Sequence, residues 1–218
     1  RAIALRLAKE GANVAVADID VANATKVSGD IKALGRKALA IKVDVTKSQD
    51  TVRMAKAVLD QFGHIDILVN NAGTIRRGAA LEFSEADWDD VLQVNLKALF
   101  FLSQAAARVM IQQGGGKIIN IASMLSFQGC IRIISYTAAK SGVAGITRAL
   151  ANEWAANGVN VNAIAPGYMA TDMNIPLMQD PARNKLIMDR VPAARWGLPK
   201  DLVGALIFLS SSASDYVN

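Results

Sequence analysis

Short apolar runs alternate with longer amphipathic segments along the whole chain, and this alternation limits the possible folds more than any other feature. Strands separated by helices of ten or more residues are typical of parallel pairing with right-handed connections. Strands that are apolar throughout are typical of a sheet covered on both faces. The sequence therefore predicts one α/β domain over residues 1–218, built on a doubly wound parallel sheet.

The individual elements follow from the hydrophobic period and from glycine and proline stop signals. The predicted strands are residues 13–17, 38–43, 65–69, 117–122 and 160–165. The predicted helices are residues 1–10, 21–34, a segment from Thr46 or Ser48 to Phe62, residues 84–112, the segment around Tyr136 up to Asn157, and residues 199–211. The helix over 84–112 is either broken near Asp90 or continuous past Asn95. Residues 172–194 are polar, rich in methionine and predicted to be irregular.

Composition and charge argue against several classes of protein. The net charge of +5 is spread along the chain, and no basic run carries interleaved aromatic residues, so nucleic-acid binding is not expected. No uninterrupted apolar stretch reaches the roughly 18 residues of a membrane helix, so no membrane span is expected. Cys130 is the only cysteine, which excludes an intrachain disulfide and favours a reducing cytoplasm. Neither Cys130 nor His64 has partners at metal-ligand spacing, so no metal site is predicted.

Polar and turn residues follow each predicted strand. Ligands of doubly wound sheets bind beyond the carboxyl ends of the strands. The residues expected at that edge are Asp18, Asp44, Asn71, Ser123 and the pair Pro166-Gly167. Their shared position predicts one ligand site, although Asp44 can also be read as a helix cap.

Tyr136 and Lys140 form the most specific pair in the chain. They are four residues apart in a predicted helix, so they share one face. A lysine ammonium beside a phenol favours the tyrosinate and is expected to lower the pKa of Tyr136 from about 10. Ser123 would then hydrogen-bond the oxygen whose charge changes. Taken alone, the pair could equally be an exposed helical contact.

The ordered set Asn70-Asn71-Ala72-Gly73, Asn95, Ser123, Tyr136-x-x-x-Lys140 and Pro166-Gly167 resembles the short-chain dehydrogenase/reductase family across the whole chain. The resemblance implies that Tyr136 is the general acid and base, that Lys140 lowers its pKa and holds the nicotinamide ribose, and that Ser123 orients the substrate oxygen. It implies that Asn95 supports a water chain. It also implies a dimer or tetramer of identical chains.

The resemblance further implies a set of cofactor-binding residues. Asp18 would bind the adenosine ribose hydroxyls, and its carboxylate would repel a 2′-phosphate, so NAD is favoured over NADP. The remaining cofactor contacts would be Asp44, Val45, Asn71, Ala72, Gly73, Tyr136, Lys140, Pro166, Gly167, Met169 and Thr171. The family's glycine-rich turn would precede Arg1, and its last strand would follow Asn218. We therefore expect the natural protein to continue in both directions, and residues 1–218 alone to bind NAD weakly.

Within the family, residues 121–129, 165–171, 195–199 and 214–218 resemble the sugar-acid branch. The implied substrate is a small anionic sugar acid of the 2-deoxygluconate, 2-keto-3-deoxygluconate or gluconate type. A guanidinium would clamp its carboxylate, from any one of Arg76, Arg77 and Arg132, although each is also readable as a solvated surface residue. Gln128 and Tyr168 are candidates for the sugar hydroxyls, and residues 172–198 for a substrate lid.

Two other functions remain open from the sequence. The first is another short-chain dehydrogenase activity, such as reduction of a 3-oxoacyl thioester, which Asp18 disfavours. The second is a regulator that binds a dinucleotide without turnover, which the intact set of Ser123, Tyr136 and Lys140 disfavours.

Overall fold

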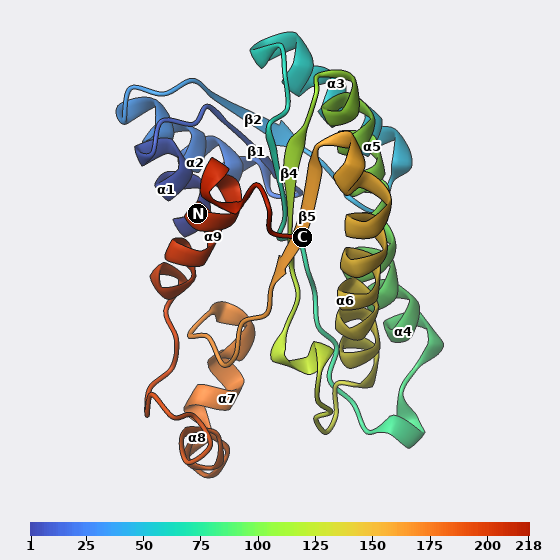
Figure 1. Cartoon of the computed structure of the whole chain (residues 1–218). Helices are drawn as coiled ribbons and strands as arrows, with labels where there is room; N and C mark the ends of the chain where they lie inside the picture. The colour runs from blue at the N-terminus through green and yellow to red at the C-terminus, as the bar shows by residue number, and fades with distance from the viewer.

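Helices cover both faces of parallel β-structure in the computed structural model, which describes residues 1–218 (Figure 1). The strands are β1 (Val14–Asp18), β2 (Ala38–Lys42), β3 (Ile67–Asn70), β4 (Gly116–Ile121) and β5 (Val159–Ile164). The helices are α1 (Ala2–Lys9), α2 (Val21–Ala33), α3 (Ser48–Phe62), α4 (Glu85–Leu92), α5 (Ala98–Gln112), α6 (Ile134–Trp154), α7 (Ile175–Gln179), α8 (Pro181–Met188) and α9 (Val203–Ser210). The predicted α/β alternation is confirmed.

The predicted doubly wound parallel α/β fold is confirmed, and its strands form two sheets. β1 pairs with β2, and β4 lies between β3 and β5. No ladder joins β1 to β3. A cavity of about 1570 Å³ is lined by both strands and by α1, and it separates the two sheets. The strand order and the crossover helices are nevertheless those of a doubly wound fold.

Neighbouring residues on β4 bury opposite faces of the larger sheet. Ile118 belongs to an apolar cluster with Met110 and Leu150, from α5 and α6. Ile119 belongs to a cluster with Leu7 and Leu206, from α1 and α9. This alternation is what a strand covered on both faces requires. Figure 1 shows the same two layers, with α1, α2 and α9 on one side and α5 and α6 on the other.

Residues 85–112 form one continuous helical run, which decides between the two alternatives for this segment. A π-helical turn over Gln93–Lys97 joins α4 to α5. The turn contains Asn95, which is 1% exposed. The run Glu85–Gln112 is long and apolar enough to cross a membrane by length and composition, but 44% of its most apolar window is buried inside the protein. In this structure it packs against β3, β4 and α6.

Two predictions at helix starts and in the lid were wrong. Lys47, rather than Thr46 or Ser48, occupies the N-cap position of α3, without a side-chain cap hydrogen bond. Residues 172–194 are largely helical, because they contain α7 and α8. Asp180 accepts hydrogen bonds from the amides of Ala182 and Arg183 at the start of α8. Proline at the first position of α8 fits a helix start.

Candidate active site

Tyr136 and Lys140 lie in the first two turns of α6, beside the carboxyl end of β4. Lys140 is 4% exposed. Its Nζ donates a hydrogen bond of 2.5 Å to the carbonyl oxygen of Ile121, the last residue of β4. The same nitrogen is 5.6 Å from the centre of the Tyr136 ring. The predicted shared face of these two side chains is therefore confirmed.

The pKa of Tyr136 differs from the prediction. Burial raises the pKa of this phenol above its usual value of 10.0, while the Ser123 hydroxyl and the positive charge of Arg77 lower it in part. Burial lowers the pKa of Lys140 to about 8. Burial thus disfavours the charged form of both groups. The net direction is therefore opposite to the predicted one, because burial outweighs the groups that lower the pKa of Tyr136.

Ser123 is fixed by a short turn that is itself tied to α6. The residue is buried and extended, and its Oγ accepts a hydrogen bond of 3.2 Å from the amide of Leu125. Ser126, in the same 3₁₀ turn, donates a hydrogen bond of 2.6 Å to the carbonyl of Lys140. The turn after β4 therefore sets the position of Ser123 relative to the helix that carries Tyr136.

Asn95 ties the loop after β3 to the π-helical turn. Its Nδ2 donates hydrogen bonds of 2.9 Å to the carbonyls of Val91 and Thr74, and its Oδ1 accepts one of 3.3 Å from the amide of Thr74. A Cβ atom at Gly73 would lie 2.9 Å from that Oδ1. Glycine is needed here because the loop backbone approaches the amide so closely. The predicted water chain at Asn95 stays a prediction.

A buried network beneath the site was not predicted. Asn70 donates from Nδ2 to Ser103 Oγ and Asn120 Oδ1, both at 2.9 Å. Asn120 donates to Thr147 Oγ1 at 3.0 Å. These four polar side chains link β3 and β4 to α5 and α6. Because each pair is separated by 27 residues or more, no local sequence pattern identifies it.

Most of the predicted cofactor residues line one space. The cavity between the sheets is bordered by Asp18, Asp44, Val45, Asn71, Ala72, Gly73, Met169 and Thr171. Carboxylates, backbone amides and a hydroxyl on a large, mostly apolar cavity suit a dinucleotide, so these residues fit such a group. Tyr136, Lys140, Pro166 and Gly167 lie outside its lining. The Pro166 carbonyl accepts a hydrogen bond from the Met124 amide, which joins that loop to the Ser123 turn.

The carboxylates of Asp18 and Asp44 accept different numbers of hydrogen bonds from neighbouring groups. Asp18 is exposed at the end of β1 and accepts one hydrogen bond of 3.0 Å, from the amide of Asp20. Asp44 accepts from the amide and the hydroxyl of Thr46, which lower the pKa of its carboxyl. Asp44 is not the cap of α3, because Lys47 occupies that position. Asp18 is therefore the freer carboxylate.

The three candidate arginines have different surroundings. Arg76 pairs with Asp87 and Asp90 on α4, the latter at 2.7 Å. Arg132 has an exposed side chain and a left-handed backbone with φ of 64°. Arg77 Nη2 donates to the carbonyl of Met173 at 3.2 Å. Of the three arginines, Arg77 is the one whose charge lowers the pKa of Tyr136 in part, against the larger effect of burial.

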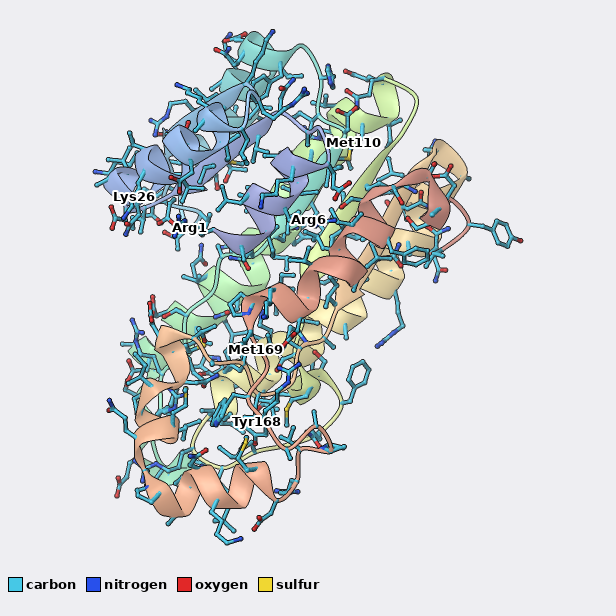
Figure 2. All side chains as sticks on the ribbon, turned by 90° about the vertical axis from the view of Figure 1, so that its left-hand side faces the viewer. Arg1, Arg6, Lys26, Met110, Tyr168 and Met169 are labelled. Atoms are coloured by element: carbon cyan, nitrogen blue, oxygen red, sulfur yellow. The ribbon has the colours of Figure 1, made fainter.

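Tyr168 joins the loop after β5 to the segment that contains α8. Its ring packs edge to face on Trp196 at 5.8 Å, and Trp196 Nε1 donates a hydrogen bond of 2.8 Å to Asn184 on α8. Figure 2 shows Tyr168 and Met169 beside the orange helices of the segment predicted as a lid. Gln128 is exposed and makes no side-chain hydrogen bond. Burial raises the pKa of Tyr168, and the charges of Arg190 and Arg183 lower it in part. Sequence reasoning missed Arg183, because no spacing signal points to it.

Comparison with known proteins gives matches over most of the chain. The family model described as short chain dehydrogenase matches residues 1–182. The chain is 57% identical to the 2-dehydro-3-deoxy-D-gluconate 5-dehydrogenase of Escherichia coli K12, over 99% of this chain and 85% of that protein. It is 53% identical, with the same coverage, to the protein of that name from Dickeya dadantii. A gluconate 5-dehydrogenase from Burkholderia cenocepacia, in complex with NADP and tartrate, has a TM-score of 0.96 and 38% identity over 100% of this chain and 85% of that one.

Proposed function

The chain belongs to the short-chain dehydrogenase family, and we propose that it interconverts a secondary alcohol and a ketone on a sugar acid, with Tyr136 as proton donor and acceptor. It is an NAD(P)-dependent oxidoreductase that acts on CH–OH groups. The observation that carries the proposal is the packing of Ser123, Tyr136 and the buried ammonium of Lys140 at one strand end.

The proton chemistry follows from the states of these groups. A bound nicotinamide would supply or accept the hydride. Tyr136, protonated in this structure, would give its phenolic proton to the oxygen of a ketone as the alcohol forms. In the reverse direction, the tyrosinate would take the hydroxyl proton. Ser123 would hold the same substrate oxygen through its hydroxyl, and the Lys140 ammonium would stabilise the tyrosinate.

The substrate side of the proposal rests on Arg77 and on the relatives. Arg77 places a guanidinium near Tyr136, and a sugar acid presents a carboxylate to it when its carbinol carbon faces the phenol. The relatives named 2-dehydro-3-deoxy-D-gluconate 5-dehydrogenase support a substrate of that type.

A substrate panel tests this function. The full-length enzyme would be incubated with NAD or NADP and a set of aldonates and, in reverse, with reduced cofactor and ketoaldonates. We expect turnover of at least one 3-deoxy or 5-keto sugar acid, followed by the absorbance of the reduced cofactor. Turnover of steroids or 3-oxoacyl thioesters, with no sugar acid used, would refute the substrate proposal.

We propose NAD rather than NADP as the preferred cofactor, with Asp18 as the reason. The exposed carboxylate would accept hydrogen bonds from the adenosine ribose and repel a 2′-phosphate. Replacing Asp18 by serine is expected to lower the ratio of kcat/KM for NAD to that for NADP by about 10-fold, because one charge repulsion disappears. Asp60→Ser, which removes an exposed carboxylate on α3, is the control. An unchanged ratio in the Asp18 variant would contradict the assignment.

We also propose a cytoplasmic homodimer or homotetramer. Cys130 is an exposed free thiol, which a reducing compartment would preserve. Trp88 and Phe101, on α4 and α5, are exposed apolar side chains that a second subunit would cover.

A further inference from the structure

Arg183 is held near the site by the lid rather than by the sheet. It lies in the first turn of α8, where its amide donates a hydrogen bond of 3.0 Å to the Asp180 carboxylate. Its neighbour Asn184 accepts the hydrogen bond from Trp196, which packs against Tyr168. The first turn of α8 is thus fixed against the loop that follows β5. The Arg183 side chain is half-buried there.

Arg183 and Arg77 bring two positive charges together from different parts of the chain. Burial lowers the pKa of the Arg77 guanidinium, and the positive charge of Arg183 lowers it further. Burial raises the pKa of the Tyr168 phenol, while the charges of Arg190 and Arg183 lower it in part. Like charges that approach each other repel, so this arrangement is unfavourable unless an anion lies between them.

Neither guanidinium is paired with a carboxylate of the protein, because the Asp180 carboxylate bonds to the backbone amide of Arg183 and not to its side chain. Neither Arg77 nor Arg183 forms an ion pair, whereas Arg76, Arg53 and Arg195 all do. The side-chain acceptors of Arg77 are the Met173 carbonyl and Asn174 Oδ1, which are both neutral. Two guanidinium groups without a counter-ion, near the proton donor, match an anionic group of the substrate.

We infer that Arg183 is a substrate-binding residue, and that it and Arg77 hold the carboxylate of the sugar acid between the lid and the β3 loop. The inference rests on the proposed function and extends it to a second guanidinium. Because Arg77 also bonds to Met173 and Asn174 in the lid, the same carboxylate would join α8 to the body of the protein. A substrate without a carboxylate would lack this connection.

The test compares Arg183→Gln with Lys185→Gln. Both remove one charge from α8, but Lys185 is exposed and already paired with Asp189. We expect Arg183→Gln to raise KM for the sugar acid about 30-fold, the loss of one charge-assisted hydrogen bond, and to leave KM for the cofactor unchanged. Turnover of the corresponding carboxamide, which lacks the charge, should not change. Lys185→Gln should resemble the unaltered enzyme in every measurement.

A double-mutant cycle with Arg77→Gln makes the assignment sharper. If both guanidinium groups bind one carboxylate, KM for the sugar acid should rise less in the double variant than the product of the increases in the two single variants. Equal KM values for the sugar acid in Arg183→Gln and Lys185→Gln would overturn the inference. The same increase of KM for the carboxamide as for the sugar acid in Arg183→Gln would also overturn it. Circular dichroism of each variant checks that the fold is retained.

A binding measurement separates this inference from the proposed function. Sodium D-gluconate would be titrated against each protein while the Trp196 emission is followed, with Trp196→Phe as the blank. If no sugar acid is turned over, the proposed function fails, but weaker gluconate binding by Arg183→Gln than by Lys185→Gln still supports the anion site. Equal binding by the two variants, or no binding by the unaltered protein, overturns it.

Discussion

Replacing Tyr136 by phenylalanine is expected to lower kcat about 1000-fold, within the range for loss of a general acid and base. The change removes one oxygen and leaves the ring, so packing against α6 and the position of Lys140 are retained. Cofactor binding, followed by fluorescence of the reduced cofactor, should be unchanged. The residual rate should no longer vary with the ionisation of a phenol.

Tyr216→Phe is the matched control for this prediction. Tyr216 is fully exposed near the chain end, so the same chemical change there should leave kcat unaltered. If Tyr136→Phe turned over substrate at the normal rate, Tyr136 would not be the proton donor. Loss of cofactor binding together with turnover would instead indicate a structural role, and it would favour a binding function for the site.

Helices and strands with a strong hydrophobic periodicity could be predicted from the sequence, because neighbouring residues alone determine which side chains are buried. The apolar runs at 117–122 and 160–165 correspond to β4 and β5, and each boundary is within about one residue of the structure. The helices of residues 172–194 were harder to predict. α7 and α8 have no clear apolar stripe, although Asp180 followed by Pro181 indicates a helix start.

The site could be predicted as far as spacing determines it. Spacing placed Tyr136 and Lys140 on one face, and strand ends placed Ser123 nearby. Burial is not encoded in that spacing, so the sequence missed that desolvation raises the pKa of Tyr136 and lowers that of Lys140. Arg183 depends on contacts between α8, Trp196 and the β5 loop, which only the tertiary structure supplies.

The π-helical turn illustrates the same limit. Asn95 was identified by its place in the motif, but its three hydrogen bonds to Val91 and Thr74 depend on how the turn meets the β3 loop. The close approach of Gly73 to the Asn95 amide likewise joins residues from two elements. Local secondary-structure propensity therefore predicts neither contact.

Replacing Lys140 by methionine is expected to lower kcat about 100-fold and to remove a pH-dependent cost from folding. The first effect follows because the buried ammonium would stabilise the negative charge that forms on Tyr136 when it gives up its proton to the substrate. The second follows because burial lowers the pKa of Lys140 from 10.5 to about 8. Below pH 8 the folded protein holds a buried ammonium, and the cost of burying it is present in full.

The sign of the pH dependence is set by which state binds more protons. Between about pH 8 and 10.5 the folded protein loses the Lys140 proton while the unfolded chain keeps it, so stability rises with pH. From pH 7 to pH 10, the free energy of unfolding of the unaltered protein should therefore increase relative to Lys140→Met by roughly 2–3 kcal/mol. Urea unfolding of both proteins across this range measures the difference. Lys97→Met, which removes an exposed lysine, should show no such change, and a constant difference for Lys140→Met would mean that the ammonium is solvated in the folded state.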